Sequence, residues 1–150
     1  MYDVCCKVPL LIKTGQFSGG HIVREEVVNL LDLFGTILDM AGDEGWKRDD
    51  SESRSLVPLL TEQKKPELDN RTFSIIGSEP QTNLTMLRRV HMKLIRQQLP
   101  NGNPIYELYD LTDQVQEVRN VFDDPQYSES RHMLVQELDH WANEQANRYP

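Results

Sequence analysis

Few side chains in this sequence have the type and spacing that catalysis or metal binding requires. Cys5 and Cys6 are the two cysteines, and they are adjacent. Successive side chains of a strand point to opposite faces, so a disulfide between them would be strained. A metal site needs further ligands at ligand spacing, and none lies nearby. We therefore expect two buried free thiols.

Two other pairs have the residue types that bind cations. Asp49 and Asp50 lie in a charged stretch that is typical of a solvated loop. His132 and His140 lie eight residues apart on a predicted helix, which places them two turns apart and too far for one metal ion. The sequence therefore predicts surface charges and surface histidines here, and no metal site.

Two basic residues have the spacing of neighbours on one face of a strand. His91 and Lys93 flank Met92 in a predicted strand, and residues two apart in a strand point the same way. A positive side chain there could pair with an acidic or polar group of a ligand. The alternative is a solvated outer face.

An α/β pattern occupies the first part of the chain. The apolar run Val8–Ile12 is typical of a buried strand, with Pro9 near its start. Apolar residues recur at helical spacing over 29–41, with Asn29 as N-cap and Gly42 as the stop. A lone strand and helix cannot build a parallel sheet, so this part is unusual for a complete protein.

From residue 71 the pattern changes to short strands and a final helix. Asn101-Gly102 is a strong turn signal, and Asp124-Pro125 separates the last strand from the helix. The predicted strands are 72–76, 84–90, 92–97 and 105–111. The apolar face of the helix is Leu134, Val135, Leu138, Trp141 and Ala142. We predict a small antiparallel sheet closed by a C-terminal helix, an α+β module.

Composition narrows the possible partners. The 150 residues carry a formal net charge of −8, whereas a nucleic-acid-binding domain normally has a broad basic face. The densest basic cluster is Arg88, Arg89, Lys93 and Arg96. No apolar stretch approaches the ~20 residues that span a bilayer, and no signal-peptide pattern follows Met1. We expect neither nucleic acid nor a membrane as a partner.

Six segments, in the right order, resemble motifs of the sulfatases, which are sulfuric-ester hydrolases of the alkaline phosphatase superfamily. The likeness is to enzymes of the arylsulfatase and choline-sulfatase type. The segments are Val8–Ile12, Val28–Gly42, Ser55–Leu60, Lys93–Ile95, Glu107–Leu111 and Leu134–Trp141. In addition, Asp113, Glu117 and Asn120 keep the spacing of a family motif, DPxExxN. Gly35 and Gln114 stand where the family usually has proline, and both are structural positions.

The resemblance implies that this chain is the C-terminal portion of a sulfatase. Residues 1–60 would end a large alkaline-phosphatase-like α/β domain, 61–70 would be a linker, and 71–150 would form the α+β subdomain. Sulfatases use a formylglycine made from the Cys or Ser of a C/S-x-P-x-R motif, and a divalent cation, usually Ca²⁺. Neither Cys5 nor Cys6 starts that motif.

By the same resemblance, the nucleophile, the metal ligands and the sulfate-binding lysines precede Met1, and no catalytic residue lies in this chain. The expected partner is the missing N-terminal sulfatase domain, with a sulfate ester bound only in the intact enzyme. The family's C-terminal subdomain often forms one wall of the substrate pocket. His91, Lys93 and Glu79 are therefore the substrate-side candidates, against the alternatives of a solvated face and an ordinary loop carboxylate.

Two other functions stay open at this point. A phosphonate or phosphodiester hydrolase of the same superfamily can share this C-terminal pattern. A free-standing α+β binding module without catalysis would need a closed core of its own.

Overall fold

The strands predicted after residue 70 form one antiparallel sheet. Its members are β1 (Arg71–Ile76), β2 (Leu84–Arg89), β3 (Met92–Gln97) and β4 (Ile105–Asp110), in the order β1-β2-β3-β4. Every neighbouring pair is antiparallel, and Leu94 lies opposite both Leu87 and Leu108. The Asn101-Gly102 turn is confirmed, because Gly102 has a φ of 83°, which glycine adopts without strain.

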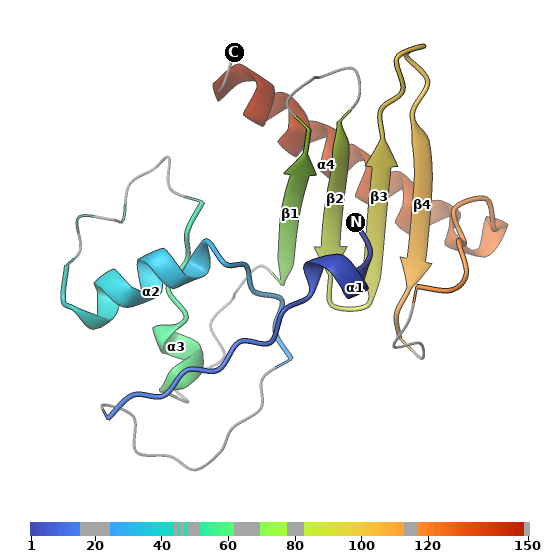
Figure 1. Cartoon of the computed structure of the whole chain (residues 1–150). Coiled ribbons are helices and arrows are strands. Elements are labelled where there is room, and N and C mark those ends of the chain that lie inside the picture. Colours follow the sequence, from blue (N-terminus) through green and yellow to red (C-terminus); the bar gives the residue numbers. More distant parts are fainter. Residues whose placement is uncertain are drawn as a thin grey trace. The chain divides into compact units, whose positions relative to one another are not determined.

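Helix α4 (Ser128–Arg148) covers one face of this sheet, as predicted (Figure 1). A short helical turn, η1 (Pro125–Tyr127), leads into it, and the Asp124 carboxylate accepts the Gln126 N–H at the start of that turn. The core lies between sheet and helix and is formed by Leu87, Leu94, Leu108, Val121, Leu134 and Leu138. The helical periodicity of the sequence therefore identified the buried face correctly.

The structure describes residues 1–15, 25–43, 45, 47, 52–61, 70–77, 83–112 and 117–148. They belong to two compact units. Unit 1 consists of Met1–Pro9 with Arg71–Pro150, and unit 2 of Leu10–Asn70. Chain segments at both ends of unit 2 therefore belong to unit 1. The predicted division into an α/β portion, a linker and a subdomain stays a prediction.

Two predictions about the first residues are wrong. The apolar run 8–12 forms no strand, and Leu11 is 84% exposed. A strand requires a ladder partner, and no described segment pairs with this one. Cys5 and Cys6 are free, as expected, but they are exposed on a one-turn helix, α1 (Asp3–Cys6), instead of buried in a strand.

Unit 2 contains helix α2 (Asp32–Met40) and the short helix α3 (Val57–Leu60). The predicted N-cap, Asn29, lies two residues before the N-cap of α2, Leu31, and its side-chain oxygen accepts the Leu31 N–H just ahead of the helix. The Asp32 carboxylate accepts the Asn29 N–H in return, at 2.8 Å. This reciprocal arrangement satisfies backbone donors that the first turn of a helix leaves free.

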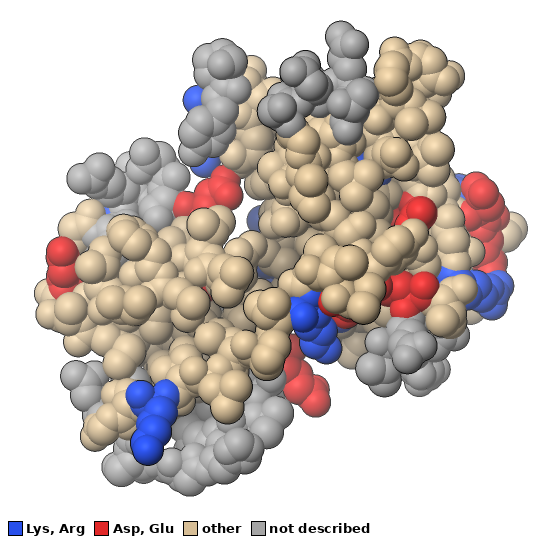
Figure 2. Space-filling view, in the orientation of Figure 1, with Lys and Arg blue, Asp and Glu red and all other residues tan. Residues whose placement is uncertain are grey.

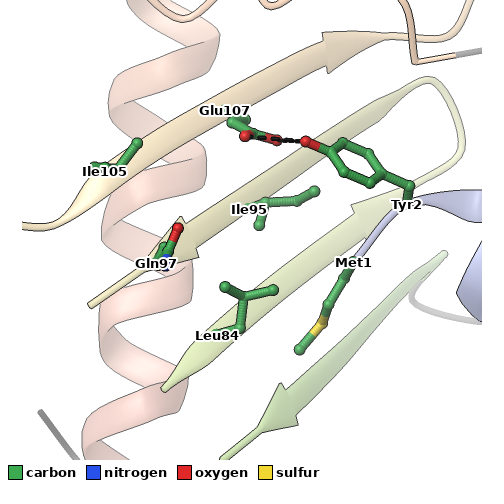
Figure 3. A pocket seen from close by; sticks show the side chains of 7 residues that line it. All are labelled: Met1, Tyr2, Leu84, Ile95, Gln97, Ile105 and Glu107. Carbon is green, nitrogen blue, oxygen red and sulfur yellow. Dashed lines mark hydrogen bonds between the residues drawn. The ribbon is translucent and has the colours of Figure 1, made fainter. Parts of the chain in front are cut away.

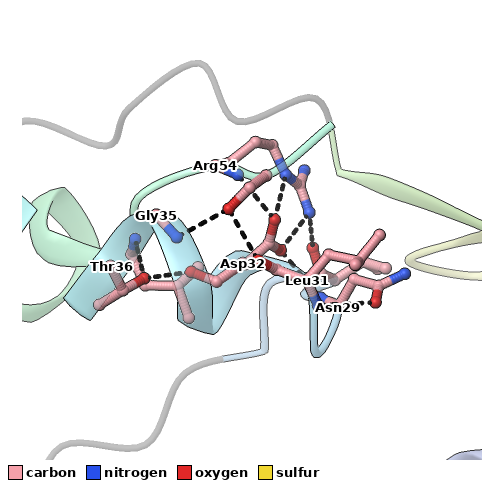
Figure 4. Close-up of polar contacts among 9 residues, drawn as sticks. Asn29, Leu31, Asp32, Gly35, Thr36 and Arg54 are labelled. Carbon is pink, nitrogen blue, oxygen red and sulfur yellow. Dashed lines mark hydrogen bonds and ion pairs between the residues drawn. The ribbon is translucent and has the colours of Figure 1, made fainter. Parts of the chain in front are cut away.

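Asp32 is also the buried member of an ion pair with Arg54, whose side chain is 27% exposed (Figure 4). Asp32 is 1% exposed, and Arg54 approaches it with its backbone N–H, its Nε and its Nη2, the last at 2.7 Å. Ser53 continues the contact by accepting the Gly35 N–H and donating to the Leu31 carbonyl. A proline in place of Gly35 would have no N–H to donate.

The apolar stripe of α2 points away from these contacts. Leu30, Phe34 and Ile37 are 62%, 59% and 63% exposed, whereas Asp32, Gly35 and Thr36 are buried. The helix thus buries its polar side within unit 2 and leaves its apolar side open. Such an apolar patch is unusual on the solvent-facing surface of a monomeric protein and is typical of a surface that packs against another domain or protein.

Candidate functional site

The face of the sheet opposite α4 carries a buried cation. Lys93 lies on β3 and is 1% exposed. Its Nζ donates to Asp3 Oδ1 at 2.7 Å and to Glu117 Oε1 at 2.5 Å. The other oxygen of Glu117 accepts the backbone N–H of Asp3, at 2.7 Å. Burial of an ammonium group is costly unless it is paired, and here two carboxylates from distant segments supply the pairing.

The electrostatics of this cluster favour the ionised form of Asp3. Burial alone would raise the pKa of Asp3, but the hydrogen bond and charge of Lys93 outweigh it, and Arg88 and Lys7 add to the effect. The pKa of this carboxyl therefore lies below its ordinary value. Arg88 is the cross-strand partner of Lys93, so two positive and two negative side chains meet here.

A second polar group lies beside the first. The Tyr2 hydroxyl donates to the Glu107 carboxylate at 2.9 Å, and the Tyr109 hydroxyl donates to the same carboxylate, also at 2.9 Å. The two rings meet edge to face with centroids 6.1 Å apart. Burial, and then the hydrogen bond to Glu107, raise the pKa of Tyr109. Both phenols therefore stay protonated near neutral pH and serve as donors to Glu107.

These side chains border a small pocket of about 150 Å³ on the open face of the sheet (Figure 3). Its lining is mainly apolar, with one carboxylate and one amide. The residues are Met1, Tyr2, Leu84, Ile95, Gln97, Ile105 and Glu107. The pocket is too small for a drug-sized or disaccharide-sized ligand, whose sites occupy roughly 300–1,000 Å³.

The structure describes two of the three predicted substrate-side residues, and these two have different surroundings. His91 is exposed and lies in the turn before β3, so it is not a strand neighbour of Lys93. Lys93 is enclosed by Asp3 and Glu117, so the alternative of a solvated face is wrong for this residue. The sequence did not indicate this burial, because the counter-charges lie 90 and 24 residues from Lys93. Glu79 lies outside the described residues. A substrate-side role for these residues stays a prediction.

Sequence reasoning missed the partners of Lys93 and Tyr2. Glu117 and Glu107 each belong to a segment with family resemblance, and this was the available signal. Motif membership identified the residues, but only the fold brings them to the same place. His132 and His140 are exposed, as predicted, and His140 lies 3.5 Å from Glu144.

The described residues do not fit a metal centre. Among them, no three His, Cys, Asp or Glu side chains gather as ligands would. Asp3 and Glu117 are engaged with Lys93. Asp49 and Asp50 lie outside the described residues. A search of the same part of the chain found no helix with the length and apolar character of a membrane span.

On the face shown in Figure 2, basic side chains are dispersed among acidic and uncharged ones. Over the described residues of that face, Lys and Arg form no continuous positive surface.

Comparisons with known proteins match the chain to one family model and to related proteins. The family model for the C-terminal region of N-sulphoglucosamine sulphohydrolase matches residues 1–144. An uncharacterised protein of Haemophilus influenzae is 25% identical over 117 residues, which cover 78% of this chain and 57% of that protein.

Three solved structures are similar to the chain in fold and sequence. BT1596, a 2-O GAG sulfatase, has a TM-score of 0.64 and 27% identity over 79% of this chain. BT4656, solved with its substrate D-glucosamine-2-N,6-O-disulfate, has a TM-score of 0.61 and 25% identity over 79%. The phosphonate monoester hydrolase SpPMH of Silicibacter pomeroyi has a TM-score of 0.57 and 26% identity over 75%.

The similarity covers only part of each of these proteins. The chain spans 25% of BT1596 and 24% of both BT4656 and SpPMH. The match to the family model extends over residues 1–144, which include the four-stranded sheet and most of its C-terminal helix. The chain therefore belongs to the N-sulphoglucosamine sulphohydrolase C-terminal family and is the C-terminal region of a sulfatase-family protein of the alkaline phosphatase superfamily.

Proposed function

We propose that this chain forms the C-terminal part of a sulfuric-ester hydrolase that acts on a sulfated amino sugar or a saccharide containing one. The family match over residues 1–144 carries the proposal. Two of the similar structures support the substrate class, since one is a GAG sulfatase and the other holds a sulfated glucosamine. The sulfatase family implies a formylglycine and a metal ion in the intact enzyme.

In this proposal the chemistry belongs to a domain that precedes the chain. The similar structures have about four times the length that this chain spans, which leaves room for such a domain. The exposed apolar stripe of α2, formed by Leu30, Leu31, Phe34 and Ile37, supports it from the side of this chain. A helix normally buries its apolar stripe, so we assign this one to the contact with the preceding domain.

The purified chain is expected to show no hydrolase activity by itself, because the proposal places nucleophile and metal ligands elsewhere. The assay incubates the chain with Ca²⁺ and an aryl sulfate, N-sulfated glucosamine or an aryl phosphonate monoester. Turnover that follows the protein through two different chromatographic separations would show that this chain holds catalytic residues.

The likeness to SpPMH favours a second candidate, a phosphonate monoester hydrolase. The intact protein decides between the two, since this C-terminal region is common to both kinds of enzyme. We expect its kcat/KM for the sulfated glucosamine to exceed that for the aryl phosphonate monoester. The reverse order would establish the second candidate and overturn the first.

Introducing a charge into the α2 stripe is expected to reduce self-association of the isolated chain. Phe34→Glu places a carboxylate in the middle of the exposed apolar stripe, which we expect to drive contact between copies of the isolated chain. Because Phe34 is 59% exposed, the substitution should leave stability almost unchanged. Sedimentation and light scattering measure the association.

Val118→Glu is the matched control, because Val118 is an exposed apolar residue of unit 1 and is 73% exposed. It should leave association close to that of the unaltered chain. Equal effects of the two substitutions would show that net charge, and not the α2 stripe, controls association.

A further inference from the structure

The first residues of the chain are bound to the open face of the sheet at three successive positions. Met1 is 7% exposed and packs with Met86, Ile95 and Tyr109. Tyr2 donates to Glu107, and Asp3 reaches Lys93 and Glu117. The partners of Tyr2 and Asp3 lie 90 to 114 residues away in sequence. We call Met1–Asp3 the strap.

We propose that Lys93 is a positioning residue that, together with Glu117, fixes the strap on the sheet. In the intact protein, and resting on the proposed function, the strap would set where the preceding domain's chain enters the subdomain. Lys93 thus acts on the course of the polypeptide, and contact with substrate is not needed to explain its burial.

The arrangement of charges explains why Lys93 is the key member of the cluster. Glu117 uses one oxygen for Lys93 and the other for the backbone N–H of Asp3, so it bridges cation and strap. Without the ammonium group, the carboxylates of Asp3 and Glu117 would lose the cation to which both are hydrogen-bonded, and Arg88 would remain as a positive charge near them. Like charges in a poorly hydrated site repel strongly, and the strap is the part that is free to leave.

The same reasoning ranks the possible substitutions. Lys93→Met removes the cation and leaves two carboxylates in repulsion, so it should release the strap most strongly. Asp3→Asn removes one carboxylate but keeps the Lys93–Glu117 pair, so it should release the strap less. Adding Asp3→Asn to Lys93→Met removes the repulsion, so the double variant should hold the strap better than Lys93→Met alone.

Amide hydrogen exchange of the full 150-residue chain provides a local test that needs no enzymatic activity. The reporters are the N–H of Asp3, which donates to Glu117, and that of Lys7, which donates to the Asp3 carbonyl. The reference is the N–H of Leu108, which donates to Asn120 within the sheet region. In Lys93→Met we expect exchange at Asp3 to accelerate about tenfold or more, with Leu108 almost unchanged.

Arg96→Met is the matched control. Arg96 lies three residues along β3, and its ion pair is with Asp139 of α4, not with the strap. Arg96→Met should leave exchange of the Asp3 N–H unchanged. Lys93→Arg keeps a positive charge at position 93, so exchange of the Asp3 N–H should stay slow in this variant.

Two results with Lys93→Met would overturn the proposal. One is equal acceleration at Asp3 and Leu108 in Lys93→Met, which would make Lys93 an ordinary core residue. The other is unchanged exchange at Asp3 in a folded Lys93→Met chain.

If Lys93→Met fails to fold, Asp3→Asn provides the test, because its altered side chain lies on the strap. Unchanged exchange at Asp3 and Lys7 in that variant would also overturn the proposal. These measurements do not depend on enzymatic activity, so they test the role of Lys93 even if the proposed sulfatase function is wrong.

Discussion

Asp32→Ala is expected to unfold helix α2 and the segment that packs on it. The carboxylate accepts hydrogen bonds from the Asn29 N–H and from three donors of Arg54, and it is 1% exposed. Removing the carboxylate costs about 1–3 kcal/mol, the range for a lost partner of charged and buried donors, because Arg54 is 27% exposed and also donates to the Val27 carbonyl. That is a large share of the stability of a unit as small as Leu10–Asn70.

Hydrogen exchange of peptides covering 30–42 and 53–60 measures this effect. Asp43→Ala is the control, because Asp43 is an exposed aspartate of the same unit whose side chain accepts the Gly45 N–H. That change should remain within about 0.5 kcal/mol. Similar exchange in the two variants would mean that the ion pair with Arg54 contributes little to unit 2.

Leu138→Ala is expected to destabilise unit 1 by about 2–5 kcal/mol, the range for removing a buried leucine side chain. Leu138 is 0% exposed and lies in the core cluster with Leu87, Leu94 and Leu108. The cost includes the lost burial and the cavity that the helix and sheet cannot close. Urea unfolding followed by circular dichroism gives the change in the free energy of unfolding.

Met133→Ala is the comparison for this prediction, because Met133 lies on the same helix and is 56% exposed. Its effect should be within about 0.5–1 kcal/mol, since little surface is removed from contact. If both substitutions lowered the urea midpoint equally, packing at Leu138 would contribute no more to stability than packing at the exposed Met133, and the prediction would be wrong.

Local sequence patterns were sufficient for the elements of unit 1. The β-branched and apolar runs placed the four strands to within one residue at each end, and the spacing of Leu134 and Leu138 gave the buried face of α4. Strand bounds and the buried face of a helix depend on residues that are close in sequence. The spacing of apolar residues along the chain therefore predicts them.

The same reasoning was incomplete for the run 8–12 and for α2. It predicted a helix over 29–41 with Asn29 as the cap, whereas α2 spans 32–40 with Leu31 as the cap, and several residues of the predicted apolar face are exposed. Periodicity shows which residues share a face, and a separate surface must decide whether that face is covered. A strand likewise exists only with its ladder partner, which no pattern within 8–12 can supply.

The sequence by itself determined the sheet, its covering helix and membership of the family, because each is carried by local pattern and ordered motifs. Only the tertiary structure decided the surroundings of Lys93. Alternation placed it on a strand, but its burial depends on Asp3 and Glu117, which arrive from segments 90 and 24 residues away. A charged side chain can be buried only where counter-charges pair with it, and here only the folded chain brings those counter-charges close.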